Sequence, residues 1–260
     1  MIFSDYHVHT AYCDGKSTPE EIVTSAIKKG MTHIGFSGHS YTFFDESYCM
    51  SKEATKEYIS SVQELKQKYA DKICVLCGIE QDCFSTEPTD AYDYVIGSVH
   101  YVKASDKYLS IDHTKDIFIS IVNEFFDGDY YSLAESYFES VGNLASAQKI
   151  DIIGHFDLVT KFNEDGALFD ESHPRYIAAW RSAVDKLIVH NIPFEVNTGA
   201  MSRGYRTKPY PSEDILDYIR SKGGRVILSS DSHSADTLCF SFNDTKQMLD
   251  NINITVAEKI

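Results

Sequence analysis

The sequence predicts an α/β protein built around a parallel sheet, and three features carry that prediction. Short apolar runs rich in β-branched residues recur along the chain, and stretches with helix signals lie between most of them. This alternation is typical of parallel sheets, because each parallel strand needs a crossover, usually a helix, to return the chain. No glycine-rich dinucleotide-binding loop follows the first run, which favours a closed barrel over an open Rossmann sheet. The apolar runs occupy residues 3–9, 33–38, 73–80, 94–99, 150–154, 192–197 and 225–230.

The first helix signal follows the first apolar run. In STPEEIVTSAIKKG, Ser17 or Thr18 can cap the helix and Pro19 suits its first turn. Gly30 is placed to end this helix. SKEATKEYISSVQELKQKYA repeats the pattern, with Ser51 as its cap and apolar residues at helical spacing. Further helical stretches are expected within 114–149, where DGDYYS separates two of them, and at 174–190 and 212–222.

The composition indicates a globular protein with an acidic surface. A length of 260 residues, 43% hydrophobic content and the absence of a long linker favour a single domain over residues 1–260. No apolar run approaches the ~20 residues that span a membrane. The N-terminus MIFSDYHVHT lacks the regions of a secretory signal, so we expect a cytoplasmic protein. The net charge of −15 disfavours nucleic acid as a partner but is compatible with a small phosphorylated ligand held by local bases and metal ions.

The six cysteines form no regular framework, and we expect free thiols in a reducing compartment. Cys74 and Cys77 form a CxxC, but a strand through ICVLCGIE would point them to opposite faces. A redox pair or a zinc knuckle at this position is therefore disfavoured.

The stretch DYHVHTAYCDG places two histidines one residue apart near the N-terminus. If residues 3–10 form a strand, His7 and His9 project from the same face of it. Taken alone, this pair fits a half-buried first strand as well as a metal site, because imidazole is both a frequent ligand and an ordinary residue. The ends of the later apolar runs decide between the two interpretations.

Ligand-type residues stand at the C-terminal ends of the later runs. In chain order they are His39, Glu80 with Asp82, His100, His155 with Asp157, Glu195 with Asn197, and Asp231 with His233. In an α/β barrel these strand ends converge on one face, where the active site is built. The shared placement therefore favours a metal centre over a set of unrelated structural residues.

The number of candidate ligands indicates more than one metal ion. A catalytic zinc site typically takes about three protein ligands and a water. Two or three divalent ions are therefore expected, and Glu80 is the best bridge between two of them because a carboxylate offers two oxygens. The candidate ligands are His7, His9, Asp14, His39, Glu80, His100, His155, Asp231 and His233.

Seven motifs bring the sequence close to a known family. DYHVHTAYCDG, GFSGHS, GIEQD, GSVHYV, IIGHFDLVTKF, FEVNTGAMSRG and ILSSDSH resemble, in order and spacing, the motifs of the PHP (polymerase and histidinol phosphatase) superfamily. The resemblance covers nearly the whole chain and is greatest to the monofunctional histidinol-phosphate phosphatases. It implies a distorted (β/α)7 barrel, a trinuclear metal centre at the C-terminal strand ends, and hydrolysis of L-histidinol phosphate in histidine biosynthesis.

The resemblance also assigns the candidate ligands to three metals. They would be His7, His9, Glu80 and Asp231 for the first metal, Glu80, His100 and His155 for the second, and His39, His233 and a residue of the first loop for the third. Some relatives have a histidine in that loop, whereas here the candidates are Asp14 and, as the weaker alternative, Cys13. A carboxylate at this position favours manganese or iron over zinc.

Clustered divalent ions suit the hydrolysis of a phosphate monoester, because they neutralise its charge, lower the pKa of a bridging water and align the attack. The nucleophile would be a hydroxide between the first two metals, which share Glu80. Asp231 could act as general base, or protonate the leaving alkoxide through water. His233 is the competing general acid if the third metal is weakly bound.

Substrate phosphate also needs cationic partners, and bases are scarce in this acidic chain. Lys161 and Arg203 follow strand ends and are the candidates for phosphate binding, together with Asn197 in the same NTGAMSRG motif as Arg203. An arginine can bind phosphate through two parallel hydrogen bonds. The alternative for either base is a solvated surface position, which we favour for Arg206 and Lys208.

Two other functions remain open from the sequence. One is a PHP-type phosphoesterase that acts on another small monoester, such as a nucleotide or a sugar phosphate, because substrate contacts lie in loops. The other is a non-catalytic metal-binding barrel module, which the full set of ligand residues and the absence of an attached polymerase disfavour. His33 precedes its apolar run instead of following it, so we expect it to lie outside the metal centre.

Overall fold

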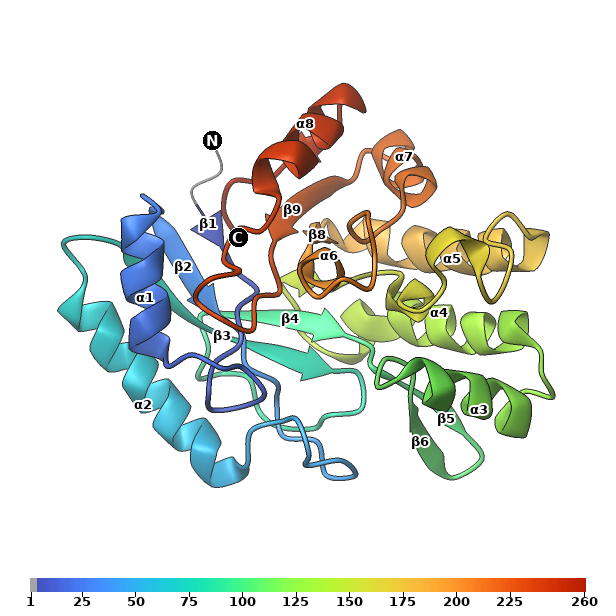
Figure 1. The fold of residues 1–260 in the computed structure, drawn as a ribbon, viewed down its shortest axis with the longest axis horizontal. Coiled ribbons are helices and arrows are strands. Elements are labelled where there is room, and N and C mark those ends of the chain that lie inside the picture. The colour runs from blue at the N-terminus through green and yellow to red at the C-terminus, as the bar shows by residue number, and fades with distance from the viewer. Residues whose placement is uncertain (1–3) are drawn as a thin grey trace.

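The computed structural model describes residues 4–260 and shows a mixed α/β fold around one large, curled sheet (Figure 1). The sheet has eight strands in the order β1-β2-β3-β4-β7-β8-β9-β10, and all neighbouring strands are parallel. The strands are β1 (Ser4–Asp5), β2 (His33–Phe36), β3 (Cys74–Asp82), β4 (Tyr94–Ser98), β7 (Ile152–Ile153), β8 (Phe194–Asn197), β9 (Arg225–Ser229) and β10 (Thr255–Val256).

Seven of these strands coincide with the apolar runs of the sequence. The first run begins at Phe3, which lies outside the described residues, and β3 continues past its run to Asp82. The eighth strand, β10, was not predicted. It is two residues long and pairs with the start of β9, so it is too short to show a hydrophobic period.

Beyond the strands, the chain that follows β1 meets the chain that follows β9. The backbone N–H of His9 donates to the carbonyl of Ser232 at 2.8 Å, and the N–H of Ser232 donates to the carbonyl of His7 at 3.1 Å. These hydrogen bonds join the first strand of the sheet to the segment after β9. His7 and His9 are thereby held beside Asp231 and His233.

The helices follow the predicted order, and their start signals act as expected. Thr18 caps the first helix and forms a capping box with Glu21, and Ser51 caps the second. The short α6 and the C-terminal α8 were not predicted. The helices are α1 (Pro19–Lys28), α2 (Lys52–Lys68), α3 (Lys115–Phe125), α4 (Tyr130–Ala147), α5 (Pro174–Leu187), α6 (Gly199–Ser202), α7 (Glu213–Ser221) and α8 (Phe242–Asn251).

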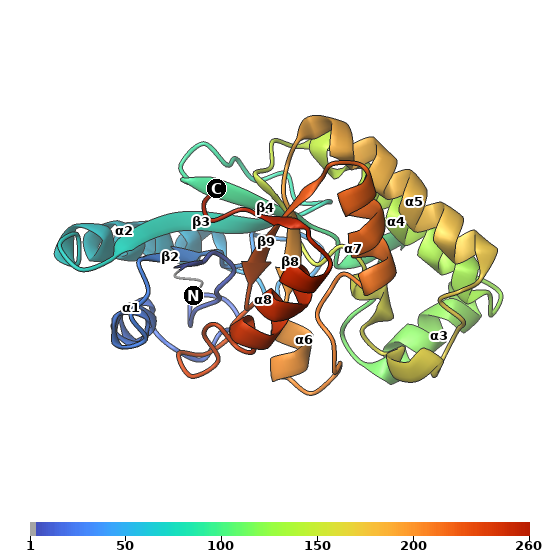
Figure 2. The ribbon, with the colours of Figure 1, turned by 90° about the horizontal axis from the view of Figure 1, so that it is seen from above.

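The helices gather around the sheet in groups. Helices α1 and α2 lie together at one end of the molecule, and α4 and α5 lie side by side at the other, in both views (Figures 1 and 2). Their apolar faces and the strands form a buried core that includes Ile22, Val62, Phe138, Val184 and Phe194. This burial stabilises the sheet whose strand ends carry the candidate ligands.

A second, antiparallel sheet follows β4. Its two strands, β5 (Tyr101–Ala104) and β6 (Lys107–Ser110), form a hairpin that the sequence did not predict. The hairpin begins one residue after His100, so it stands next to the C-terminal end of β4.

All six cysteines are free thiols, as expected. Cys74 is exposed and Cys77 is buried, so the CxxC spans two faces of β3. Within residues 4–260, the structure contains no helix both long enough and apolar enough to cross a membrane.

Candidate metal centre

The predicted ligands lie together at the C-terminal ends of the parallel strands. Register explains part of this convergence, because His39 forms a parallel bridge with Glu80, and Val8, between His7 and His9, forms one with Ser232. The imidazoles are packed tightly, and the ring centroids of His9 and His233 are 4.2 Å apart. Side chains from at least four strands therefore meet in one small volume.

Glu80 stands at the centre of this cluster and is almost completely buried. Five histidine nitrogens approach its two carboxylate oxygens. Those near Oε2 are His39 Nδ1 at 2.9 Å, His7 Nε2 at 3.3 Å and His9 Nε2 at 3.5 Å, and those near Oε1 are His155 Nε2 at 2.9 Å and His100 Nε2 at 3.3 Å. Burial acts to raise the pKa of Glu80, but the surrounding histidines outweigh it and hold that pKa well below its ordinary value.

Asp231 is the second carboxylate of the cluster. Its Oδ1 lies 3.2 Å from His9 Nε2 and 3.6 Å from His233 Nδ1. Its Oδ2 accepts a hydrogen bond from the Arg203 guanidinium at 2.9 Å. The backbone of Asp231 has φ = 47°, a left-handed conformation that aspartate tolerates better than most residues.

A glycine makes room for this arrangement. A Cβ atom at position 199 would lie 2.6 Å from Asp231 Oδ2 and 2.9 Å from the Arg203 guanidinium. Only glycine allows the backbone to come so close to the ion pair. The NTG part of the motif therefore packs beneath Asp231 and Arg203.

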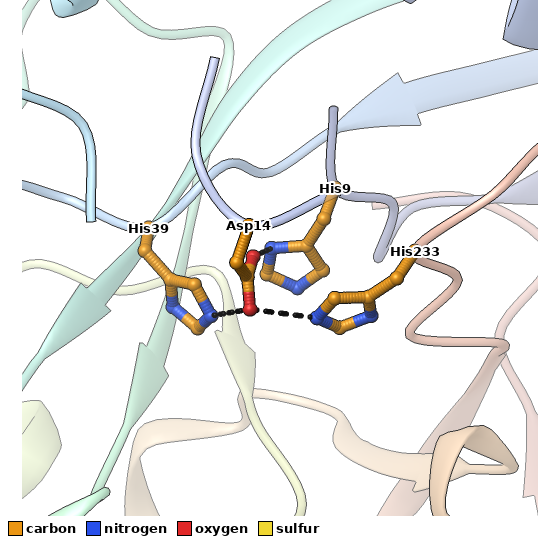
Figure 3. A group of neighbouring side chains, drawn as sticks. All are labelled: His9, Asp14, His39 and His233. Carbon is orange, nitrogen blue, oxygen red and sulfur yellow. Dashed lines mark hydrogen bonds and ion pairs between the residues drawn. The ribbon is translucent and has the colours of Figure 1, made fainter. Parts of the chain in front are cut away.

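A third group of ligand atoms surrounds Asp14, as Figure 3 shows. Its Oδ2 is 3.1 Å from His233 Nε2 and 3.7 Å from His39 Nε2, and its Oδ1 is 3.6 Å from His9 Nδ1. Burial acts to raise the pKa of Asp14, but these histidines outweigh it and hold that pKa well below its ordinary value. The first loop thus brings a carboxylate to the group.

Cys13, the weaker candidate in the same loop, also lies near this group. Its Sγ is 3.6 Å from His9 Nδ1 and donates to the Thr10 carbonyl. Burial raises the pKa of the Cys13 thiol to about 12, so the thiol stays protonated near neutral pH. Asp14 is the ionised side chain of the two.

The donor set fits divalent metal ions. Buried polar atoms nearly always have hydrogen-bond partners, yet His7 Nε2, His9 Nε2 and Glu80 Oε2 lie close together without forming a well-aligned hydrogen bond to any described residue. Burial, together with the nearby His233 and His39, lowers the pKa of His9 to about 3, so its imidazole is neutral and can donate a lone pair. Three groups could each hold an ion, namely His7, His9 and Glu80; His39, Glu80 and His100; and His9, Asp14, His39 and His233.

Two further carboxylates orient the candidate ligands from behind. Glu195 Oε1 lies 2.6 Å from His7 Nδ1, and its Oε2 accepts a hydrogen bond from the His155 backbone at 2.8 Å. Asp82 Oδ2 lies 3.3 Å from His100 Nδ1 and accepts from the His100 backbone at 3.0 Å. Carboxylates in these positions fix the ring orientation and tautomer of metal-binding histidines. The sequence placed both acids at strand ends but gave them no role.

A cavity of about 450 Å³ opens above the cluster, and both predicted phosphate-binding bases line it. Arg203 reaches it from the segment after α6, beside Asp231. Lys161 donates to the Asp112 backbone carbonyl at 2.6 Å and lies 3.3 Å from Asp112 Oδ2. The sequence did not identify the other residues that line this cavity, which are Asp45, Ser47, Tyr48, Tyr101, Ser110, Asp112, His113, Leu158 and Tyr205.

Asn197, which the sequence predicts to bind substrate, is not among the residues that line this cavity. Its side chain is fully buried, donates to Glu195 Oε2 at 3.0 Å and accepts from the Gly199 backbone. Arg206 pairs with Glu164 away from the cavity. His33 also lies outside the cluster, with its ring beside Thr32.

The fold and this cluster define the chain as an α/β protein with a histidine–carboxylate centre at the carboxyl ends of a curled parallel sheet. The PHP domain model matches residues 5–199, which is most of the chain. The chain belongs to the PHP domain family.

Curated relatives of similar length align with most of this chain. The histidinol-phosphatase of Bacillus subtilis is 26% identical over 262 residues, covering 92% of this chain and 96% of that protein. A Deinococcus radiodurans protein that is provisionally named a histidinol-phosphatase is 29% identical over 251 residues, covering 92% and 90%.

Two solved structures have the same fold. A Listeria monocytogenes protein, provisionally named a histidinol phosphatase, matches with a TM-score of 0.80 at 20% identity, over 93% of this chain and 99% of that one. The Lactococcus lactis histidinol phosphate phosphatase was solved with zinc, L-histidinol and phosphate. It matches with a TM-score of 0.70 at 21% identity, over 97% of this chain and 94% of that one.

Proposed function

We propose that this chain is a metal-dependent phosphatase that hydrolyses L-histidinol phosphate to L-histidinol and phosphate. The observation that carries the proposal is the convergence of five histidines on Glu80 beneath a cavity that Arg203 and Lys161 also line. Family membership and the names of the curated relatives support it. The acidic balance of the chain suits a small substrate with a cationic end and disfavours nucleic acid.

The proposal includes the finer architecture. Residues 1–260 would form a single domain, a distorted (β/α)7 barrel with the metal site at the C-terminal strand ends. The hydrogen bonds of Ser232 with His7 and His9 support closure of the ring. The strand β10 would then lie outside the ring, since it pairs with the start of β9. We place the protein in the cytoplasm, where free cysteines persist.

We propose two to three divalent ions, with manganese or iron favoured over zinc at the group that contains Asp14. Glu80 would be shared between ions, as its two oxygens face different histidines. When bound, these ions neutralise phosphate charge and lower the pKa of a water molecule.

The chain's own residues would then bind the substrate and move protons. Arg203 and Lys161 would hold phosphate oxygens, as charged donors do. As water attacks phosphorus, Asp231 would accept its proton. Asp231 would pass this proton to the ester oxygen as the phosphorus–oxygen bond breaks. His233, whose Nδ1 lies 3.6 Å from Asp231 Oδ1, is the competing general acid if the third metal is weakly bound.

A panel of phosphate monoesters tests this function directly. L-histidinol phosphate should give a higher kcat/KM than p-nitrophenyl phosphate, nucleotides, sugar phosphates and phosphodiesters, and chelation should abolish the activity. A nucleotide or sugar phosphate that proves the best substrate by about tenfold, or 1.4 kcal/mol, would indicate another PHP-type phosphoesterase. Bound metal without hydrolysis of any ester would indicate a non-catalytic metal-binding module.

A further inference from the structure

The outer wall of the cavity is made by two segments that pack against each other. The loop at 40–50 leads from His39 to α2, and the β5–β6 hairpin follows His100. The Phe44 ring of the loop stacks on Tyr108 of the hairpin, with centroids 3.9 Å apart and planes at 6°. Tyr101 meets Phe44 edge to face at 4.9 Å. Aromatic pairs in these geometries stabilise a contact beyond its buried area, so loop and hairpin hold each other.

This contact fixes the carboxylate of Asp45. Its Oδ2 accepts a hydrogen bond from the Tyr101 hydroxyl at 2.7 Å. Its Oδ1 accepts from the backbone and the hydroxyl of Ser47, at 3.1 and 2.6 Å. Partial burial acts to raise the pKa of Asp45, but the hydrogen bonds from Ser47 and Tyr101 outweigh it and keep the pKa below its ordinary value. Asp45 is therefore ionised and pre-oriented at neutral pH.

Asp45 differs from the other carboxylates that line the cavity. Asp231 pairs with Arg203, Asp112 pairs with Lys161, and the metal-centre acids face histidines. Within residues 4–260, no lysine, arginine or histidine lies within 4.0 Å of the Asp45 carboxylate. The exposed His113 adds only an attraction through space. Asp45 thus leaves a negative charge at the outer wall that a ligand can neutralise.

The position of Asp45 in the cavity determines which part of a bound substrate its carboxylate can contact. The Tyr48 ring lies between the centre and the outer wall, with its centroid 4.7 Å from the His39 ring and 6.1 Å from the Tyr101 ring. In L-histidinol phosphate the amine is on the carbon next to the ester carbon, so it stays beside a phosphate bound at the metal centre. The imidazole is at the opposite end of the molecule and reaches furthest from phosphorus.

We propose that Asp45 determines substrate specificity by accepting a hydrogen bond from the imidazole of the substrate, against a wall formed by Tyr48 and Tyr101. This inference rests on the proposed function and adds the residue that recognises the end of the substrate remote from the phosphate. Asp45 takes no part in bond making or breaking, so its contribution lies in binding.

The test compares three phosphate monoesters on metal-loaded protein. L-histidinol phosphate carries both amine and imidazole, ethanolamine phosphate carries the amine alone, and p-nitrophenyl phosphate carries neither. Asp45→Asn keeps the shape of the side chain and removes its charge. Its kcat/KM for L-histidinol phosphate should fall roughly 10–100-fold, as for a lost charged hydrogen bond, mainly through a higher KM. The other two esters should be hydrolysed as by the wild type.

Two further variants test whether this result is specific to the Asp45 carboxylate and its hydrogen bonds. Asp106→Asn removes an equivalent charge from the exposed tip of the hairpin, outside the cavity, and should behave as wild type. Tyr101→Phe removes one donor to Asp45 and should produce a smaller loss that is again confined to L-histidinol phosphate.

The outcomes distinguish failure of this inference about Asp45 from failure of the proposed phosphatase function. A wild-type protein that shows no preference for L-histidinol phosphate over ethanolamine phosphate overturns the proposed function, and this inference with it. A wild-type preference that Asp45→Asn leaves intact overturns the inference alone. So does an Asp45→Asn protein that loses the same factor on all three esters, because that pattern reports damage to the metal centre.

Discussion

The inner and outer ends of the cavity are built by different means. At the inner end, Glu80 and its histidines come from the ends of parallel strands, and backbone pairing sets their positions. At the outer end, Asp45 and Tyr101 come from a loop and a hairpin that meet through stacked aromatic rings. The difference indicates that the sheet positions the residues for hydrolysis, whereas the loop and the hairpin determine which substrate binds.

The two ends also differ in how firmly each side chain is held. His7 and His100 each face a second carboxylate behind them, Glu195 and Asp82, so these rings have little freedom. The outer wall relies on contacts between partly exposed rings, such as Phe44. Damage at the inner end should therefore abolish catalysis, while damage at the outer end should shift only substrate preference. Four substitutions test this separation.

The largest effect is expected for Glu80→Gln, at the centre of the inner end. The amide keeps the size of the side chain but removes the charge that faces five histidines, so fewer metal ions should bind. We expect kcat/KM to fall by at least about 10³-fold for every ester, more than the 10–100-fold typical of outer-shell partners. Elemental analysis and kinetics measure both effects.

The matched control for Glu80→Gln is His33→Gln, which changes a histidine of β2 outside the cluster. It should keep the wild-type metal content and activity. A Glu80→Gln protein with full metal content and activity would contradict the assignment of the centre.

The next largest effect is expected for Arg203→Ala, at the boundary between metal centre and substrate. Loss of a charged contact to phosphate should lower kcat/KM by roughly 10²–10³-fold for every ester. Metal content should stay close to that of the wild type, because Asp231 Oδ1 still faces His9 and His233. Arg203→Lys should recover only part of the loss, since a point charge cannot replace a bidentate donor. Wild-type kinetics in both variants would assign phosphate binding to Lys161 or the metals.

A smaller, indirect effect is expected for Glu195→Gln. The amide can still occupy the space behind His7, but it weakens the 2.6 Å contact that holds the ring and its tautomer. Metal affinity should fall roughly 10–100-fold, and excess metal should restore activity. Titration with a metal-competing chelator measures the affinity. If added metal fails to restore activity, Glu195 has a role beyond orienting His7.

The sequence predicted that ligand-type residues converge at the inner end, because hydrophobic period and strand ends are local signals. Each of His39, Glu80 and His155 follows or ends an apolar run, and parallel pairing then brings them together. The same rule selected Asn197, which also ends a run, but its side chain bonds to Glu195 and to the Gly199 backbone. A strand end specifies a location, and the direction of the side chain depends on packing that sequence period does not encode.

The sequence contains no comparable local signal for the outer end of the cavity. Asp45 acquires its position from Tyr101, 56 residues further along the chain, and from Phe44 packing on Tyr108. No periodic pattern links the loop at 40–50 to the hairpin, and the hairpin itself was not predicted. Contacts between loops distant in sequence are set by tertiary packing, which explains why the convergence of the ligand-type residues was predicted and the outer wall was not.

The smallest effect is expected for Phe44→Ala, which tests whether the two ends are separable. The change removes the ring that stacks on Tyr108 and meets Tyr101, so Asp45 should lose its fixed orientation while keeping its charge. KM for L-histidinol phosphate should rise roughly three- to tenfold, since the side chain must be reordered on binding. Metal content and hydrolysis of p-nitrophenyl phosphate should not change, because the rings that pack on Phe44, which are Phe43, Phe84, Tyr101 and Tyr108, are not candidate ligands. Val189→Ala, at a side chain 76% exposed and outside the cavity, is the control. A loss of metal or of p-nitrophenyl phosphate hydrolysis in Phe44→Ala would show that the outer wall also supports the centre, and the two ends would then have to be treated as one structure.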